Sequence, residues 1–282
     1  MKTITYKSKT KLIEKILEDE NIKELSKSSV FGKILKKKEN TDVYFHSGSL
    51  DKEAHLNIQN AQKVIVNSER VKKELSEFEE KIEVIYPSID IKYDDIEKIK
   101  KEVYSQLDIE INKKTILFTA KNFKTSGVYD FLNIINYINF KDFVAIIAGD
   151  KKEIANLKFK ISRMEVNEKL ILLDDYDDID KLFIASDIFL LPTTNKTFNT
   201  NILKAMYCKC AVFTTVINDA SELVDVFSTM ESPQDRSMQF KLDALLQNEE
   251  ELNTIKKQNY DVSKEYTLDK QLEKLKDIIS KI

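Results

Sequence analysis

Glycine is the residue that this sequence most clearly lacks. Its 282 residues include four glycines, Gly32, Gly48, Gly127 and Gly149, whereas average usage is about 7%. Loops that cradle phosphate groups need glycine, because the backbone must approach the ligand closely and adopt positive φ. The shortage therefore argues against a glycine-rich nucleotide-binding loop.

Metal-binding residues are also scarce. The two cysteines, Cys208 and Cys210, form a C-x-C pair, and the chain has only two histidines. This set is too small for a typical zinc site. We interpret both cysteines as buried free thiols of a protein in a reducing compartment.

Long apolar runs and an excess of one charge are absent as well. The longest runs, "IFLL" and "FVAIIA", are too short to span a bilayer. The first residues lack the apolar core of a signal peptide, so we expect a cytoplasmic protein with no membrane span. With 45 basic and 48 acidic residues, the net charge of −3 argues against a nucleic-acid partner.

Alternating strand and helix patterns occupy the rest of the chain. Residues 2–40 are lysine-rich and read as mostly helical, and strands are predicted at 41–46, 63–68 and 81–90. From residue 115 the alternation is regular, with apolar strands predicted at 115–120, 143–149, 169–173, 187–192 and 211–215. Such strands, separated by amphipathic helices, predict parallel sheets covered on both faces.

The predicted fold class is therefore α/β, with two Rossmann-like units. We expect a reduced N-terminal unit at 1–91, a connecting helix at 92–112, a complete domain at 113–233, and C-terminal helices at 234–282 that pack back onto the domains. A parallel sheet binds ligands at the carboxyl ends of its strands. In the complete domain these ends are 119–124, 149–150, 174–177, 192–198 and 214–218.

The order of these segments resembles a known family. Between about residues 60 and 230, "AQKVIVNSERVKKEL", "FVAIIAGD", "DIDKLFIASDIFLLP" and "FNTNILKAMYCKCAVFTT" follow one another as in the family-4 retaining glycosyltransferases. The resemblance implies a GT-B fold that binds a sugar nucleotide in its C-terminal domain and an acceptor in its N-terminal domain. Transfer in that family takes place in the cleft between them.

The family's two catalytic-site glutamates, E-x7-E, fall on Lys196 and Lys204. In the family, the first lies near the donor sugar and the second accepts hydrogen bonds from ribose hydroxyls. A lysine ammonium only donates hydrogen bonds, so it cannot replace that acceptor. The charge reversal also removes the anions that would stabilise an oxocarbenium-like transition state.

Other positions of the family's donor site also differ. The strand-end glycine and arginine fall on Ala120 and Lys121, and Lys121 keeps the charge without arginine's fork. A second diphosphate contact, a lysine, falls on Ser126, and Asp174 stands where a glycine is expected. The remaining positions that the resemblance assigns to this crevice are Gly127, Gly149 and the Gly-Phe-Gly positions Thr197, Phe198 and Asn199. The family's proline after the C-x-C pair falls on Ala211, and its preceding glycine falls on Lys209.

The N-terminal half departs from the family in the same direction. No Gly-Gly loop occurs anywhere in the chain, and before residue 90 we expect only about three strands. The acceptor side is therefore predicted to be truncated. We interpret His46, which follows a predicted strand, and His55, in the next helix, as ordinary structural histidines.

Three interpretations remain for the lysines. Lys121, Lys196 and Lys204 either converge as an anion site or reach past the rim into solvent; a lysine-based active site is the third. The five aspartates of "DDYDDID", 174–180, suit helix capping better than a metal site. The last helix, "LDKQLEKLKDIISKI", is expected to pack back onto the fold.

Taken together, these residues predict a glycosyltransferase homologue without catalysis and without cofactors or metal. It would act as a binding or scaffold subunit of a larger bacterial assembly, with protein partners on its truncated N-terminal side. The alternatives are a divergent sugar-nucleotide transferase of envelope glycan synthesis and a regulatory subunit that senses an anion or nucleotide.

Overall fold

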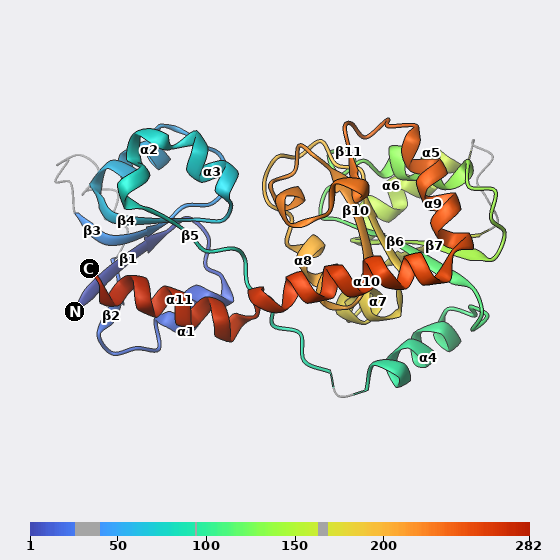
Figure 1. Ribbon diagram of the computed structural model, residues 1–282, viewed down its shortest axis with the longest axis horizontal. Helices are drawn as coiled ribbons and strands as arrows, with labels where there is room; N and C mark the ends of the chain where they lie inside the picture. Colours follow the sequence, from blue (N-terminus) through green and yellow to red (C-terminus); the bar gives the residue numbers. More distant parts are fainter. Residues whose placement is uncertain (26–39, 94, 163–168) are drawn as a thin grey trace. The chain divides into compact units, whose positions relative to one another are not determined.

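Two compact units make up the chain. The computed structural model describes residues 1–25, 40–93, 95–162 and 169–282. Unit 1 comprises residues 1–90 together with 265–282, and unit 2 comprises residues 91–264 (Figure 1). The helix predicted as a connector, α4 (Ile96–Gln106), thus belongs to unit 2. The last helix, α11 (Leu268–Ser280), belongs to unit 1.

Unit 1 is built on a five-stranded sheet in the order β2-β1-β3-β4-β5, and every pairing is parallel. The strands are β1 (Lys2–Tyr6), β2 (Ile22–Glu24), β3 (Thr41–Phe45), β4 (Ala61–Val66) and β5 (Ile82–Val84). The helices α1 (Lys11–Ile16) and α11 cover one face, and α2 (Lys52–Asn60) and α3 (Glu69–Glu74) cover the other (Figure 1).

Strict alternation along the central strands gives unit 1 two separate cores. In β3, Val43 and Phe45 pack with residues of α1 and α11, whereas Tyr44 packs with α2 and α3. Neighbouring residues of a strand point to opposite faces, so a strand that is apolar throughout buries both sides. The α/β class with two Rossmann-like units is confirmed.

Two strands of unit 1 contradict the expected architecture. Both β1 and β2 precede residue 41, so the expectation of about three strands before residue 90 is wrong. The segment "KTITY" carries β-branched residues, which favour an extended backbone. Its Ile4 is completely buried, and Thr3 donates from both its N–H and its hydroxyl to Asp42 at 2.7 Å. Of the stretch predicted as helical, 26–39 lies outside the described residues.

Helix α11 completes unit 1 from the far end of the chain. Leu268, Leu275 and Ile279 join the same core as Ile4. The Ile89 N–H donates to the Tyr266 carbonyl, and the Leu268 N–H donates to the Ile89 carbonyl, both at 2.8 Å. Residues from the two ends of the sequence therefore share one core.

Unit 2 contains a six-stranded parallel sheet in the order β11-β10-β9-β6-β7-β8. Its strands are β6 (Lys114–Thr119), β7 (Phe143–Gly149), β8 (Leu170–Asp174), β9 (Ile188–Leu191), β10 (Ala211–Thr215) and β11 (Thr229–Met230). The predicted apolar strands of this domain are confirmed. The chain reverses its direction of travel between β6 and β9, which places a topological switch point there.

The helices of unit 2 lie on both faces of its sheet (Figure 1). Besides α4, those that bear on the two sites described below are α5 (Val128–Asn136), α6 (Lys151–Ile161), α7 (Ile179–Ala185), α8 (Thr200–Tyr207) and α10 (Glu249–Ser263). A further helix, α9 (Ser237–Gln247), contacts α5 and α10. Among the described residues, no helix is both long and apolar enough to cross a membrane.

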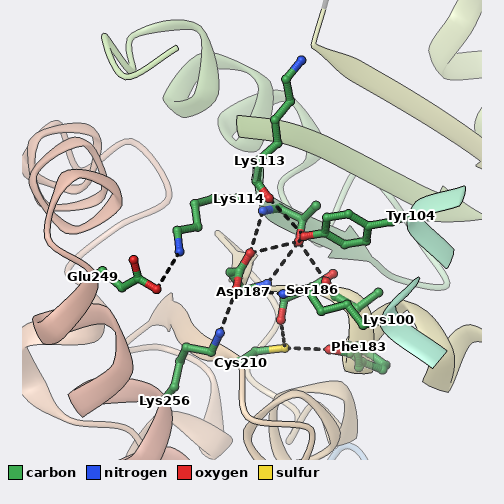
Figure 2. A network of polar contacts seen from close by, with 12 residues as sticks. Lys100, Tyr104, Lys113, Lys114, Phe183, Ser186, Asp187, Cys210, Glu249 and Lys256 are labelled. Atoms are coloured by element: carbon green, nitrogen blue, oxygen red, sulfur yellow. Dashed lines mark hydrogen bonds and ion pairs between the residues drawn. The ribbon is translucent and has the colours of Figure 1, made fainter. Parts of the chain in front are cut away.

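One buried carboxylate connects the helices α4 and α10 to this sheet. Asp187 directly precedes β9 and is 3% exposed. Its Oδ1 lies 2.8 Å from the Lys256 Nζ of α10 and 3.4 Å from the Lys100 Nζ of α4. Its Oδ2 accepts the Thr115 N–H of β6 at 3.0 Å. Figure 2 shows this network converging on Asp187.

The environment of Asp187 keeps its carboxyl ionised. Burial by itself would raise the pKa of the group, but the ammonium groups of Lys256 and Lys100 and the Thr115 N–H bring it below the usual value. Removing charge from a buried pair leaves the partner charges uncompensated, which is why such changes are costly.

We expect Asp187→Asn to lower the free energy of unfolding by about 3 kcal/mol. Because the folded-state pKa is lowered, the stabilisation is present above the unfolded-state pKa of about 4 and disappears as the pH falls below it. Urea unfolding at neutral and acidic pH measures both effects.

Asp261→Asn is the matched control. Asp261 also contacts two lysines, Lys257 and Lys264, each at 2.7 Å, but it lies at the surface. We expect no measurable loss for this variant, because water screens the exposed pair. Equal losses in the two variants would contradict the role assigned to burial.

Candidate functional site

A crevice lies at the carboxyl edge of the unit 2 sheet, at its topological switch point. It encloses about 440 Å³. Its walls come from the ends of β6 and β7, the segment after β8, and the start of α7 and of α8. The lining residues are Thr119, Ala120, Lys121, Gly149, Asp150, Asp175, Tyr176, Ile179, Thr200, Asn201 and Lys204.

Of the residues assigned to this crevice from sequence, the structure brings four together in its lining: Ala120, Lys121, Gly149 and Lys204. The others lie beside or behind it, in the loop before α5, at the end of β8 and in the loop before α8. They are Ser126, Gly127, Asp174, Lys196, Thr197, Phe198 and Asn199.

Lys204 carries its own counter-ion. Its Nζ lies 2.7 Å from the Asp180 Oδ1, and the two side chains are 32% and 22% exposed. Asp180 is in the first turn of α7, within the acidic run, where the helix dipole favours a carboxylate. The charge of Lys204 is therefore balanced from within the chain.

The three lysines do not converge. Lys196 is exposed in the loop before α8 and does not line the crevice. Lys121 is exposed and does line it, and within the described part of the chain it forms no ion pair. The crevice thus offers one ammonium group without an ion pair among the described residues, that of Lys121, and Asp150 and Asp175 line the same crevice.

Asparagine side chains accept hydrogen bonds from backbone N–H groups at the start of α8 and in the loop before it. The Asn195 Oδ1 accepts the Thr197 N–H at 3.0 Å, and the Asn199 Oδ1 accepts the Asn201 N–H at 3.0 Å. The first N–H groups of a helix lack partners within the helix, so they bind either a cap or an anion. Here the chain supplies the cap.

Asn218 holds this loop in place through its side chain. The residue was not identified from the sequence. It is completely buried. Its Oδ1 accepts the N–H groups of Asn199 and Ala220, and its Nδ2 donates to the carbonyls of Asn195 and Thr197, all within 2.8–3.3 Å. These four bonds use both donors and both acceptor lone pairs of the amide. Its place as the cap of the short helix after β10 was the available signal.

Packing alone explains the two retained glycines. Gly127 has φ of 83°, and a Cβ there would lie 1.7 Å from the Pro192 carbonyl oxygen. A Cβ on Gly149 would lie 2.4 Å from the ring of Phe123. Neither glycine requires a phosphate ligand to account for it.

The acidic run is used within the protein. Asp178 caps α7 by accepting the Asp180 N–H, and its two oxygens accept the Tyr93 hydroxyl at 2.8 Å. Burial, and then the hydrogen bond to Asp178, raise the pKa of Tyr93. The described residues contain no group of three or more His, Cys, Asp or Glu side chains placed to hold a metal ion.

The cysteines are buried and free, as predicted. Burial raises the pKa of the Cys210 thiol to about 12. The thiolate is the reactive form of cysteine, so this side chain is not a nucleophile at neutral pH.

His46 occupies the corresponding edge of unit 1. It directly follows β3, next to the switch point between β1 and β3. Its side chain is buried at 4% exposure, and within the described residues neither ring nitrogen has a hydrogen-bond partner. Burial lowers its pKa. His55, in contrast, is bonded through Nδ1 to the Asp51 carbonyl at 3.1 Å.

Comparison with known proteins identifies relatives. The family model described as "Glycosyl transferases group 1" matches residues 100–262, while no curated protein matches the chain. A glycosyltransferase from Rickettsia africae ESF-5 is 18% identical with a TM-score of 0.73, over 99% of this chain and 89% of the other.

Two further solved structures share the fold. Alr3699/HepE of Anabaena, in complex with UDP-glucose, is 18% identical with a TM-score of 0.73, over 85% of this chain and 72% of the other. WaaG, a glycosyltransferase involved in lipopolysaccharide biosynthesis, is 14% identical with a TM-score of 0.66, over 98% of this chain and 85% of the other.

Gly127→Ala tests whether packing fixes that glycine. We expect a loss of roughly 2–5 kcal/mol in the free energy of unfolding, since the positive φ and the clash with Pro192 add. Gly48→Ala is the control, because Gly48 has φ of 85° with no atom within 4 Å of the added Cβ. It should cost about 1 kcal/mol. If urea unfolding gave equal losses of unfolding free energy for the two variants, the contact with Pro192 would not be the cause.

His46→Phe tests the burial of the imidazole. Because the folded-state pKa is lowered, the unfolded chain binds the proton more tightly. Wild-type stability should therefore fall by up to about 1.4 kcal/mol per pH unit as the pH drops below the unfolded-state pKa of about 6.5. Urea unfolding at a series of pH values should show that the variant lacks this pH dependence of the unfolding free energy. An unchanged slope would show that His46 is not the titrating group.

Proposed function

We propose that this chain, which belongs to the family of glycosyl transferases group 1, is a member that no longer binds a sugar nucleotide and acts as a non-catalytic binding subunit. The single observation that carries the proposal is the ion pair between Lys204 and Asp180. It fills the place where the sequence resemblance assigns the ribose-binding glutamate.

The ion pair removes the required chemistry in two ways. A lysine cannot accept hydrogen bonds from ribose hydroxyls. Its partner Asp180 is already engaged with the ammonium at 2.7 Å, so a nucleotide would have to compete with an existing bond. Both groups are mostly shielded, so the pair is less screened than an ion pair at the surface.

The diphosphate side supports the same conclusion. A donor diphosphate needs backbone N–H groups at a helix start and cationic side chains. The N–H groups of Thr197, Asn199 and Asn201 are already bonded to asparagine oxygens. Lys121 alone remains as a cation in the crevice. A diphosphate would therefore gain little beyond one exposed charge.

A divergent transferase is the second candidate. The crevice still has a volume of about 440 Å³ at the switch point, within the range of about 300–1,000 Å³ typical of ligand pockets. The related Anabaena protein has UDP-glucose as its ligand. This candidate requires the Lys204–Asp180 pair to open when a donor enters.

Calorimetric titration with UDP-glucose and GDP-mannose at low ionic strength separates the candidates. We expect no saturable heat corresponding to a Kd below about 1 mM, roughly 4 kcal/mol of binding. Tighter binding that Lys121→Ala weakens would overturn the proposal in favour of the transferase.

Lys124→Ala is the matched control for that titration. Lys124 is an exposed lysine of the same loop that does not line the crevice. A nucleotide bound in the crevice should respond to Lys121→Ala and not to Lys124→Ala. Equal effects of both variants would indicate general attraction to surface charge.

A further inference from the structure

A second cavity lies at the opposite, amino-terminal edge of the unit 2 sheet. It encloses about 780 Å³, and its walls come from α4, the end of α7, the end of α8 and one face of α10. Ser186 precedes β9, and Lys209 precedes β10, which places both at that edge. It is therefore separate from the crevice at the carboxyl ends.

Lysines dominate the polar part of this cavity. Lys100, Lys209, Lys256 and Lys257 all line it. Lys100 and Lys256 share a single carboxylate oxygen, the Oδ1 of Asp187 (Figure 2). Two ammonium groups thus face one carboxylate, while Asp95, Glu97 and Asp261 also line the cavity. The Lys100 and Lys256 side chains are only 26% and 19% exposed, so water screens their charges poorly.

The second oxygen of Asp187 is used by the sheet and not by the lysines. It accepts the Thr115 N–H at 3.0 Å and lies 3.4 Å from the Thr115 hydroxyl, which also donates to the Ala185 carbonyl at 3.1 Å. Each ammonium has three donors. Lys256 uses one on Asp187, and Lys100 makes one long bond and lies over the ring of Tyr104. Donors therefore remain for a ligand.

Lys209 adds a third ammonium group. It lies over the ring of Tyr260 at 5.2 Å and forms no ion pair with any described residue. Its backbone has φ of 63°, a conformation that favours glycine. The presence of a lysine at a position that favours glycine is explained if a ligand binds to its ammonium group.

The carboxylates of the lining have partners of their own. Asp95 caps α4 by accepting the Lys98 N–H, and Asp261 pairs with Lys257 of the same lining and with Lys264. Glu97 lies in the first turn of α4, where the helix dipole favours a carboxylate.

Apolar side chains line the same cavity. Ile96, Ile184 and the ring of Tyr260 contribute to its walls. A ligand that fits has a dianionic end for the lysines and a small apolar body for these side chains. A phosphate monoester has both properties, and its two charges match the ammonium groups better than one carboxylate does.

We propose that the cavity between α4 and α10 is a binding site for a small phosphate monoester, held by Lys256, Lys100 and Lys209. The site is independent of the crevice and takes a terminal phosphate dianion, which sugar nucleotides lack. Binding would add charge-assisted bonds to the same lysines that Asp187 already holds.

The test is calorimetric titration of the full chain with phenyl phosphate and with inorganic phosphate at constant ionic strength. We expect saturable binding of both, with phenyl phosphate tighter because of its apolar ring. Lys209→Gly should raise the Kd by about fivefold, the effect of roughly 1 kcal/mol from one ammonium near the surface. This variant should fold, because glycine suits the positive φ.

Lys121→Ala and Lys124→Ala provide the controls, and both should leave the Kd unchanged. Loss of binding in Lys121→Ala would move the phosphate into the crevice and overturn the proposal. Absence of saturable binding to the wild type, or a Kd unaffected by Lys209→Gly, would overturn it as well. None of these outcomes depends on whether sugar nucleotides bind.

Discussion

The buried charge of Asp187 is the constraint around which unit 2 is arranged. A carboxylate that is removed from water needs compensating partners, and here they come from three separate elements. Lys100 fixes α4, Lys256 fixes α10, and Thr115 fixes the start of β6. Because all three partners converge on the residue that directly precedes β9, the positions of two helices and two strands are set together. A purely apolar contact would not specify that register.

In the crevice at the other edge, side chains of the protein itself engage many of the polar groups. Apart from Lys121, the polar groups considered for a nucleotide are bonded within the chain: the N–H groups of Asn201 and Asn199 to Asn199 and Asn218, and Lys204 to Asp180. The retained glycines serve packing against Pro192 and Phe123. The crevice is therefore still open, although most of its hydrogen-bonding groups already have partners within the protein.

Sequence reasoning predicted the regular part of the fold, because apolar strands alternating with amphipathic helices determine a parallel sheet. It missed β1 and β2, where short segments with a single fully buried residue, Ile4, adjoin a helix of clear periodicity. In the crevice, it identified Lys204 but not its partner. Asp180 lies 24 residues away, and only the packing of α7 against α8 brings the two together. Asn218 was missed because its four bonds reach residues 2–23 positions away.

The shared core of α1, β1 and α11 has a consequence for how the protein is made. During synthesis, unit 2 is contiguous from residue 91 to 264 and can fold as soon as it leaves the ribosome. Residues 1–90 are made before unit 2, yet the face of their sheet that α1 covers stays incomplete until Leu268, Leu275 and Ile279 arrive. Unit 1 is thus completed only after unit 2 has been made. In the interval its exposed apolar face is the surface that chaperones would have to shield.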